Sequence, residues 1–282
     1  SVINEIYTLN SLIGQDVVYP FTSFVNGSSI NFEICNVEFN KTSTDFQEPY
    51  PNPNAGFRML YKSDGKGNAS PNTGFFFYFK QGTLSFKDSL IATPIENQVI
   101  DINYENIVNN DVWVQSIAQD GTVNVNWTKV PVVNGSNVIF NSIDNSLRNI
   151  FEVVTRVDDQ VSIKFADGRF GNAPKGVIRT WYRTGNGETY IIRPEDLTDV
   201  TITIPYYSRN DNQLYDMTFV MDLQEAVQNS TETEDLPSIQ ANAPLVYSTQ
   251  DRMVTAEDYS VYPLQVSTNI KKIKSTNRIH SG

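Results

Sequence analysis

Apolar and polar side chains alternate with a period of two along many segments of this chain. The clearest case is the pair of segments 112–118 and 122–130, which flank the dipeptide Asp120-Gly121. A period of two places the apolar set on one face of a β-strand, and Asp-Gly favours the tight turn of a hairpin. The same alternation over residues 214–223 predicts a strand there and not a helix.

Turn residues divide the first half of the chain into further short strands. Asn26-Gly27 separates the apolar segments 17–25 and 30–39, which predicts a second hairpin. Residues 75–79 form a continuous aromatic run. This run predicts one strand with both faces covered, either by the chain's own core or by a partner chain.

These patterns predict a mixed, β-rich (α+β) fold, with two or three domains of mostly antiparallel sheet and a few short helices near the C-terminus. The helices are expected late because Ser230 or Thr231, and further on Thr255, are candidate N-caps, each soon followed by a proline that ends the helix. The expected domains are a β-rich domain at 1–145, a β domain with a glycine-rich corner at 146–229, and a small α/β segment with two short helices at 230–282.

The segment FADGRFGNAPKG, residues 165–176, predicts a rigid corner at the end of a strand. An aspartate in a turn can accept a hydrogen bond from the backbone two residues on, and glycine permits backbone angles that other side chains forbid. The residues of this structural corner are Phe165, Asp167, Gly168, Gly171, Pro174 and Gly176. One carboxylate and one arginine do not make an acid–base pair, and these glycines do not open a helix that could bind phosphate. The segment therefore predicts architecture and not catalysis.

Composition narrows the classes of function. The net charge of −11 disfavours a nucleic-acid surface, because such surfaces carry clustered Lys and Arg. No apolar segment of the sequence reaches the length that spans a bilayer, so a membrane is not an expected partner either. One cysteine, Cys35, and one histidine, His280, do not supply a zinc site or a well-placed thiol–base pair. We therefore expect no enzyme activity, no cofactor and no metal.

Trp113 and Trp127 lie in the first predicted hairpin, beside positions rich in Asn and Thr. Such aromatic residues can pack in a core, contact another subunit, or stack on sugar rings. All three interpretations stay open from the sequence. The two tryptophans are therefore candidate interface residues, and a carbohydrate-binding β module of a tail or surface protein is the alternative function.

FADGRFGNAPKG followed by VIRTWYRTGNG resembles the F-G-D-G-x-x-G-x-x-P corner of the baseplate J-like proteins of contractile phage tails, with Ala166 in place of the family's first glycine. Residues 231–259 resemble a later motif of that family: a short helix with an acidic start, a small-residue-proline step, and an Arg-x-Val-Thr-x-x-Asp-Tyr segment. The matching residues are Pro244, Arg252, Thr255, Asp258 and Tyr259. The β-rich first half and the lysine-rich end are similar to the larger T-even-type branch, with this chain as the C-terminal half of a longer polypeptide.

The resemblance implies a late structural protein of the virion, located in the tail baseplate and assembled in the host cytoplasm. It implies that this half of the protein forms a homodimer between neighbouring wedges, so that the wedges close into a ring around the hub. Other baseplate wedge subunits are further partners in this account. It also implies a hinge that lets the ring widen before the sheath contracts.

Overall fold

A computed structural model describes residues 3–9, 18–40, 45–53, 57–63, 74–133, 148–169, 171–188, 191–208, 210–224 and 226–227. Within these ranges the fold is β-rich, and its helical structure consists of the 3₁₀ turns Val157–Asp159 and Pro194–Asp196. The prediction of a β-rich, mostly antiparallel fold is confirmed. The helices expected near the C-terminus lie outside the described residues, as do Pro244, Arg252, Thr255, Asp258 and Tyr259.

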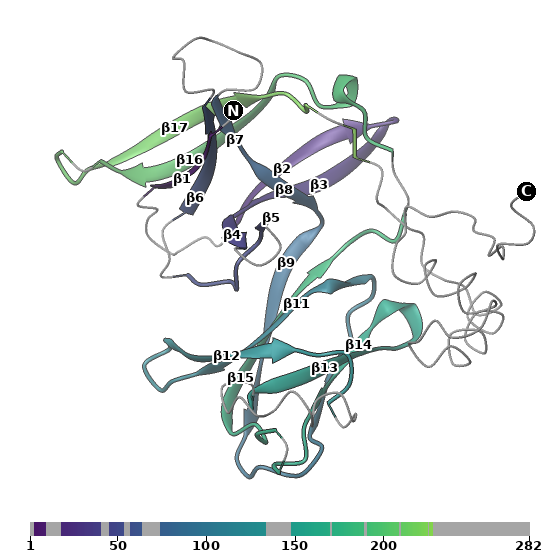
Figure 1. The fold of residues 1–282 in the computed structure, drawn as a ribbon. Helices are drawn as coiled ribbons and strands as arrows, with labels where there is room; N and C mark the ends of the chain where they lie inside the picture. Colours follow the sequence, from purple (N-terminus) through teal and green to yellow (C-terminus); the bar gives the residue numbers. More distant parts are fainter. Residues whose placement is uncertain are drawn as a thin grey trace, which may run out of the picture. The chain divides into compact units, whose positions relative to one another are not determined.

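The largest sheet of the described residues has seven strands (Figure 1). They are β9 (Thr83–Ile91), β10 (Val99–Ile102), β11 (Ile107–Ile117), β12 (Val123–Lys129), β13 (Ile150–Thr155), β14 (Val161–Phe165) and β15 (Gly176–Thr184). Their order is β10-β14-β13-β12-β11-β15-β9, and only the short pairing of β12 with β13 is parallel. The two edge strands approach each other, since Lys87 Nζ on β9 donates to the Asp101 carbonyl on β10 at 2.8 Å. The sheet is therefore nearly closed, like a barrel.

The alternating apolar positions of this sheet meet in its core. Val114 of β11 is the register partner of Trp127 of β12, and both are buried. The Trp127 ring meets the Phe165 ring edge-on, with the centroids 5.0 Å apart. The hairpin around Asp120-Gly121 forms as the alternation predicts. The buried core residues are Ile91, Ile100, Ile102, Ile107, Val112, Val114, Trp127, Phe151, Val161, Ile163, Phe165, Ile178 and Tyr182.

A second sheet has the order β2-β3-β8, with β2 at Val18–Val25, β3 at Ser28–Cys35 and β8 at Tyr78–Gln81. The turn between β2 and β3 holds Asn26 at φ 51° and Gly27 at φ 81°. Two positive φ angles are what a type I′ hairpin turn requires, and Asn-Gly is its preferred dipeptide. The hairpin predicted from this dipeptide is confirmed.

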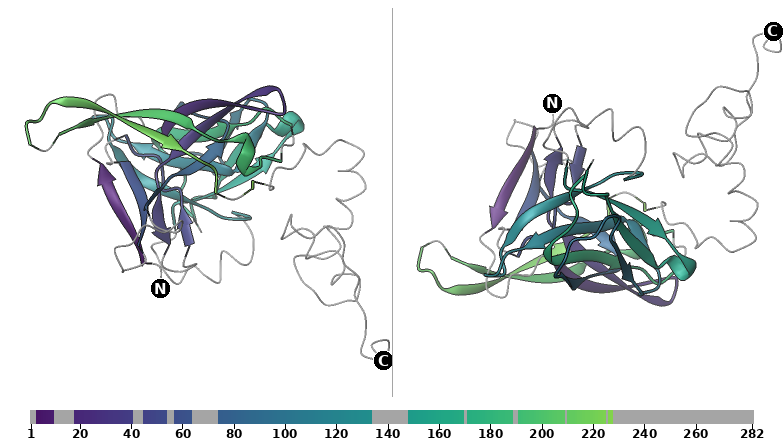
Figure 2. Two further views of the ribbon diagram at one scale, coloured as in Figure 1. Left: turned by 90° about the horizontal axis from the view of Figure 1, so that it is seen from above. Right: turned by 90° about the horizontal axis from the view of Figure 1, so that it is seen from below.

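The remaining strands form smaller sheets. β1 (Ile3–Leu9), β6 (Phe57–Ser63) and β7 (Gly74–Phe76) pair in the order β1-β6-β7, and β4 (Glu38–Asn40) pairs with β5 (Asp45–Gln47). β16 (Val200–Tyr207) and β17 (Leu214–Met221) form a hairpin, drawn as the long green ribbon in Figure 2, and β17 confirms the strand predicted over 214–223. A second core joins β6 and the β16-β17 hairpin to β2 and β3 through Tyr19, Ile34, Phe57, Met59, Ile202 and Ile204.

The prediction of a single strand over residues 75–79 is wrong. β7 ends at Phe76 and pairs with β6, whereas β8 begins at Tyr78 and pairs with β3. Phe77 lies between the two strands and packs on Phe219 of β17, with ring centroids 4.9 Å apart. The aromatic run is thus shared between two sheets, and Phe75 is 52 % exposed, so the run is not covered on both faces.

Contacts along the chain define two compact units. One comprises residues 1–186 with 195–223, and the other comprises residues 187–194 with 224–282. The first unit contains the sheets described above, and in the second Ile192 and Val227 form an isolated β-bridge. This division differs from the expected boundaries at 145 and 229, because strands from both sides of residue 145 are neighbours in the seven-stranded sheet.

Candidate functional site

The outer face of the seven-stranded sheet carries an aromatic, a polar and an aliphatic row of side chains. Ile178 and Tyr182 of β15 point into the core, so the alternate residues of β15 point outward. Residues that are directly opposite in register share one face of a sheet. The outer face therefore carries three rows across β9, β15 and β11: Phe86, Trp181 and Trp113; Asp88, Arg179 and Gln115; and Leu90, Val177 and Ile117.

Arg183, the outward residue at one end of β15, is fully buried and contacts three carboxylates. Its Nη1 lies 2.6 Å from Asp111 Oδ2 and 2.9 Å from Glu48 Oε2, and its Nη2 donates to Glu48 Oε1 at 2.9 Å. Its Nε lies 3.3 Å from Glu33 Oε2. Lys80 Nζ lies 2.5 Å from Asp111 Oδ1 and 3.0 Å from Glu48 Oε2. We call these five residues the Arg183 cluster.

The Arg183 cluster links two sheets. Glu33 is on β3 and Lys80 is on β8, while Asp111 is on β11 and Arg183 is on β15. Glu48 comes from the segment after β5. The cluster thus connects the β2-β3-β8 sheet to the outer face of the seven-stranded sheet. A change in how the two sheets pack would leave charges buried without partners, which is strongly unfavourable.

Burial and mutual pairing set the protonation of these groups. Burial raises the pKa of Glu33, against the opposing effect of the hydrogen bond from the Leu84 backbone and the charge of Arg183. Burial lowers the pKa of Lys80, but the carboxylates of Glu48 and Asp111 outweigh it, so the net shift is upward. The cluster therefore keeps its ammonium charged.

Cys35 lies against the same cluster. Its Sγ accepts a hydrogen bond from Arg183 Nη2 at 3.3 Å and donates to the Glu33 carbonyl at 3.4 Å. Burial raises the pKa of the Cys35 thiol, which keeps the sulfur protonated. A protonated, buried thiol packs as a small side chain and is a poor nucleophile.

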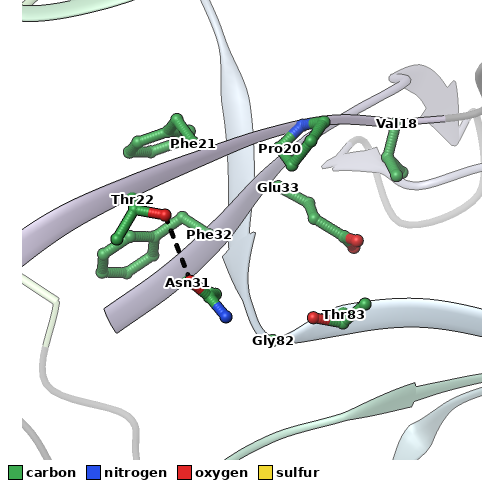
Figure 3. Close-up of a pocket in the computed structure, with 9 residues that line it drawn as sticks. All are labelled: Val18, Pro20, Phe21, Thr22, Asn31, Phe32, Glu33, Gly82 and Thr83. Atoms are coloured by element: carbon green, nitrogen blue, oxygen red, sulfur yellow. Dashed lines mark hydrogen bonds between the residues drawn. The ribbon is translucent and has the colours of Figure 1, made fainter. Parts of the chain in front are cut away.

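A hollow of about 310 Å³ adjoins the cluster beside β2 and β3 (Figure 3). It is lined by Val18, Pro20, Phe21, Thr22, Asn31, Phe32, Glu33, Gly82 and Thr83. Thr22 Oγ1 donates to Asn31 Oδ1 at 3.1 Å, and both Glu33 oxygens lie 2.9 Å from the Leu84 backbone N–H. The acidic group that lines the hollow is the Glu33 carboxylate. It already accepts hydrogen bonds from the Leu84 N–H and from Arg183 Nε.

The described residues contain no group of three or more His, Cys, Asp or Glu side chains placed to hold a metal ion. None of the helices described in the chain is long and apolar enough to cross a membrane. The carboxylates that do gather, in the Arg183 cluster, are held by two cations. This arrangement fixes the packing of one sheet against another.

The predicted corner follows β14. Phe165 is buried in the core, and Asp167 Oδ1 accepts a hydrogen bond from the Arg169 N–H at 2.9 Å. Gly168 adopts φ 84°, and Gly176 adopts φ 82° where β15 begins. Pro174, which lies between these two glycines in the sequence, is buried.

Gly171 has a different reason to be glycine. A Cβ on this residue would lie 2.6 Å from the Ala166 Cβ and 2.9 Å from Ile150 Cγ1. The next residue, Asn172, donates its backbone N–H to the Arg148 carbonyl at 2.7 Å. The corner is therefore packed closely against the chain segment that leads into β13.

We expect Gly168→Val to lower the free energy of unfolding by about 1–3 kcal/mol, because a β-branched residue is strained at positive φ. A Cβ at this position has only the Ala173 Cβ near it, at 4.0 Å, so the cost comes from the backbone. Asparagine tolerates left-handed angles, and Gly168→Asn should therefore cost clearly less. Urea unfolding of both variants measures the difference, and equal losses would contradict the backbone explanation.

The two tryptophans do not form a joint surface. Trp127 is 3 % exposed, and its Nε1 donates to Ser116 Oγ at 2.8 Å, so it belongs to the core and not to an exposed interface. Trp113 is on the opposite face of the hairpin and half-buried, with Lys80 Nζ 5.8 Å from its ring centroid. Trp127 is therefore not available to stack on a sugar ring, whereas Trp113 keeps part of its surface accessible.

The sequence reasoning missed the Arg183 cluster. Its members are far apart in the chain: Glu33 and Arg183 are separated by 150 positions, and Asp111 and Arg183 by 72. The available signal was a charged residue, Arg183, directly after the aromatic residues Trp181 and Tyr182 of β15. Such a residue is usually solvent-exposed, so the signal is weak without the fold.

Comparison with known proteins gives one family. Residues 1–226 match the model of the family described as Domain of unknown function (DUF8360). No curated protein and no solved structure matches the chain. Since the matched residues make up well over half of the sequence, the chain belongs to the DUF8360 family.

Proposed function

We propose that this protein is a structural subunit of a contractile phage tail baseplate wedge, and that two copies pair to link neighbouring wedges into a ring. The observation that carries the proposal is the corner at residues 165–176. Its sequence resembles the corner of the baseplate J-like proteins, and in this chain it is a fixed turn, with the Asp167 bond and the positive φ of Gly168.

The Arg183 cluster supports a mechanical role. A ring component has to transmit force between its contacts, and it does so best when its sheets move as one body. Four buried charged groups and the partly exposed Lys80 hold the two sheets in one relative position, because sliding would separate the pairs. This arrangement suits a stiff scaffold.

The location and the remaining partners follow from the resemblance. We place the protein in the virion at the tail baseplate, in contact with other wedge subunits, and we assign it a part in the rearrangement that precedes sheath contraction. Residues 231–259 supply the second family motif, with its short helices, in this proposal. The chain's charge of −11 keeps free copies apart until a specific contact forms.

Sedimentation equilibrium of the full 282-residue chain tests the proposal. We expect a reversible dimer at about micromolar concentration, because a specific contact of at least roughly 1,000 Å² usually supports such an affinity. A chain that stays monomeric throughout this range, or that binds a glycan as a monomer, would contradict it. The second outcome would instead favour the carbohydrate-binding alternative.

A further inference from the structure

Three aliphatic side chains form a row across one end of the outer face of the seven-stranded sheet. Leu90 on β9 is the register partner of Val177 on β15, which is the partner of Ile117 on β11. Leu90 is 77 % exposed, and the other two are half-buried. We call these residues the aliphatic row. A large exposed leucine continuous with further apolar side chains is typical of a contact surface.

A polar row borders it. Arg179 donates from Nε and Nη2 to the two carboxylate oxygens of Asp88, both at 2.8 Å, and its guanidinium lies 4.2 Å from the centroid of the Phe86 ring. Phe86 is itself 48 % exposed. The border of the aliphatic row therefore carries one acid and one base, with no net charge, in a chain whose net charge is −11.

We infer that the aliphatic row, with the Asp88–Arg179 pair, is the surface on which a second copy of this chain docks about a two-fold axis. The inference rests on the proposed function, which requires a contact between two copies of the chain, and it identifies the residues of that contact. A two-fold contact uses the same patch twice, so the patch has to be complementary to itself. Here apolar side chains meet apolar side chains, and Arg179 of each copy comes close to Asp88 of the other.

Charge favours a second copy on this surface over other exposed apolar surfaces. The β16-β17 hairpin also exposes Leu214, at 52 %, and Val220, at 64 %. By sequence, residues 199–222 carry four aspartates and one arginine, a net charge of −3, so two copies of this hairpin would repel each other. The aliphatic row is bordered by one acid and one base, Asp88 and Arg179, so two copies of it would not repel each other in this way.

The test compares two exposed strand positions in the full chain, Leu90→Asp and Val220→Asp. Both side chains are largely exposed, so neither change removes core packing, and thermal melting followed by circular dichroism should leave both variants folded. Sedimentation equilibrium should then give Leu90→Asp a dimer Kd at least about tenfold above that of the unaltered chain, whereas Val220→Asp stays within about twofold.

A charge-reversal pair tests the symmetry directly. Asp88→Arg gives a border with two cations and Arg179→Asp gives a border with two anions, so each variant alone should dimerise poorly. An equal mixture should associate, because each patch then meets one of opposite charge. The proposed docking surface is wrong if the mixture associates no better than either variant alone. It is also wrong if Leu90→Asp dimerises as well as the unaltered chain. In both cases the protein would still form a homodimer, through another surface. An unaltered chain that remains monomeric would overturn both the surface and the homodimer.

Discussion

Replacing Arg183 with methionine should lower the free energy of unfolding by about 3–5 kcal/mol, the largest effect of any single side chain that we expect in this fold. The guanidinium is fully buried and contacts the carboxylates of Glu33, Glu48 and Asp111. Methionine fills a similar volume but leaves these carboxylates with Lys80 as their nearby cation. Urea unfolding at neutral pH, followed by tryptophan fluorescence, measures the loss.

Arg58→Met is the matched control. Arg58 pairs with Glu38 at 4.0 Å, and the two side chains are 39 % and 37 % exposed. A solvent-exposed pair contributes at most about 1 kcal/mol, so this variant should unfold close to the unaltered chain. Adding Glu33→Gln to Arg183→Met should recover part of the loss, because Glu33 is the carboxylate whose ion pair is with Arg183, whereas Lys80 still pairs with Glu48 and Asp111. Similar losses for Arg183→Met and Arg58→Met would show that the cluster does not hold the sheets together.

Gly82→Ala should be the second most damaging change, with an expected loss of at least about 3 kcal/mol from strain and close contact together. Gly82 joins β8 to β9 at φ 111°, an angle that residues with a Cβ rarely adopt. A Cβ there would lie 2.5 Å from the Thr184 carbonyl oxygen and 3.1 Å from Arg183 Cγ. The backbone oxygen belongs to the strand that carries Arg183, so it cannot move away without disturbing the cluster.

Gly121→Ala separates the two contributions to this loss. Gly121 also has a positive φ, 84°, but nothing lies within 4 Å of where its Cβ would be. Its replacement should therefore cost only the backbone strain, about 1–2 kcal/mol. If Gly82→Ala and Gly121→Ala have equal midpoints in chemical unfolding, the close approach of Gly82 to β15 does not contribute to the loss of stability.

The sequence predicts those parts of the fold that depend on near neighbours in the chain. Asn26-Gly27 and Asp120-Gly121 define hairpins because the turn alone sets the pairing of the strands beside it. The period of two in β17 is equally local. The split of the aromatic run at Phe77 could not be predicted, because it depends on contact with Phe219 in a strand far along the chain.

The candidate site shows the same limit. The bond of Asp167 to the Arg169 N–H and the positive φ of Gly168 involve residues that are close in sequence, and turn chemistry suggests them directly. Trp113 and Trp127 are on opposite faces because Val114 is the register partner of Trp127, and alternation within each strand does not give this register. The partners of Arg183 depend on the packing of two sheets, which no segment of the sequence encodes alone.

We propose that this protein is a stiff scaffold that pairs with its own copy. Native-state hydrogen exchange tests this proposal most directly, when it is measured on the full chain above and below the concentration at which the chain dimerises. The amides of β3, β8, β9 and β15 should open in one cooperative step, because the Arg183 cluster joins their sheets, and dimer formation should slow exchange in β9 around Leu90. Separate opening of the β2-β3-β8 sheet at much lower free energy, or exchange in β9 that is independent of concentration, would contradict the account.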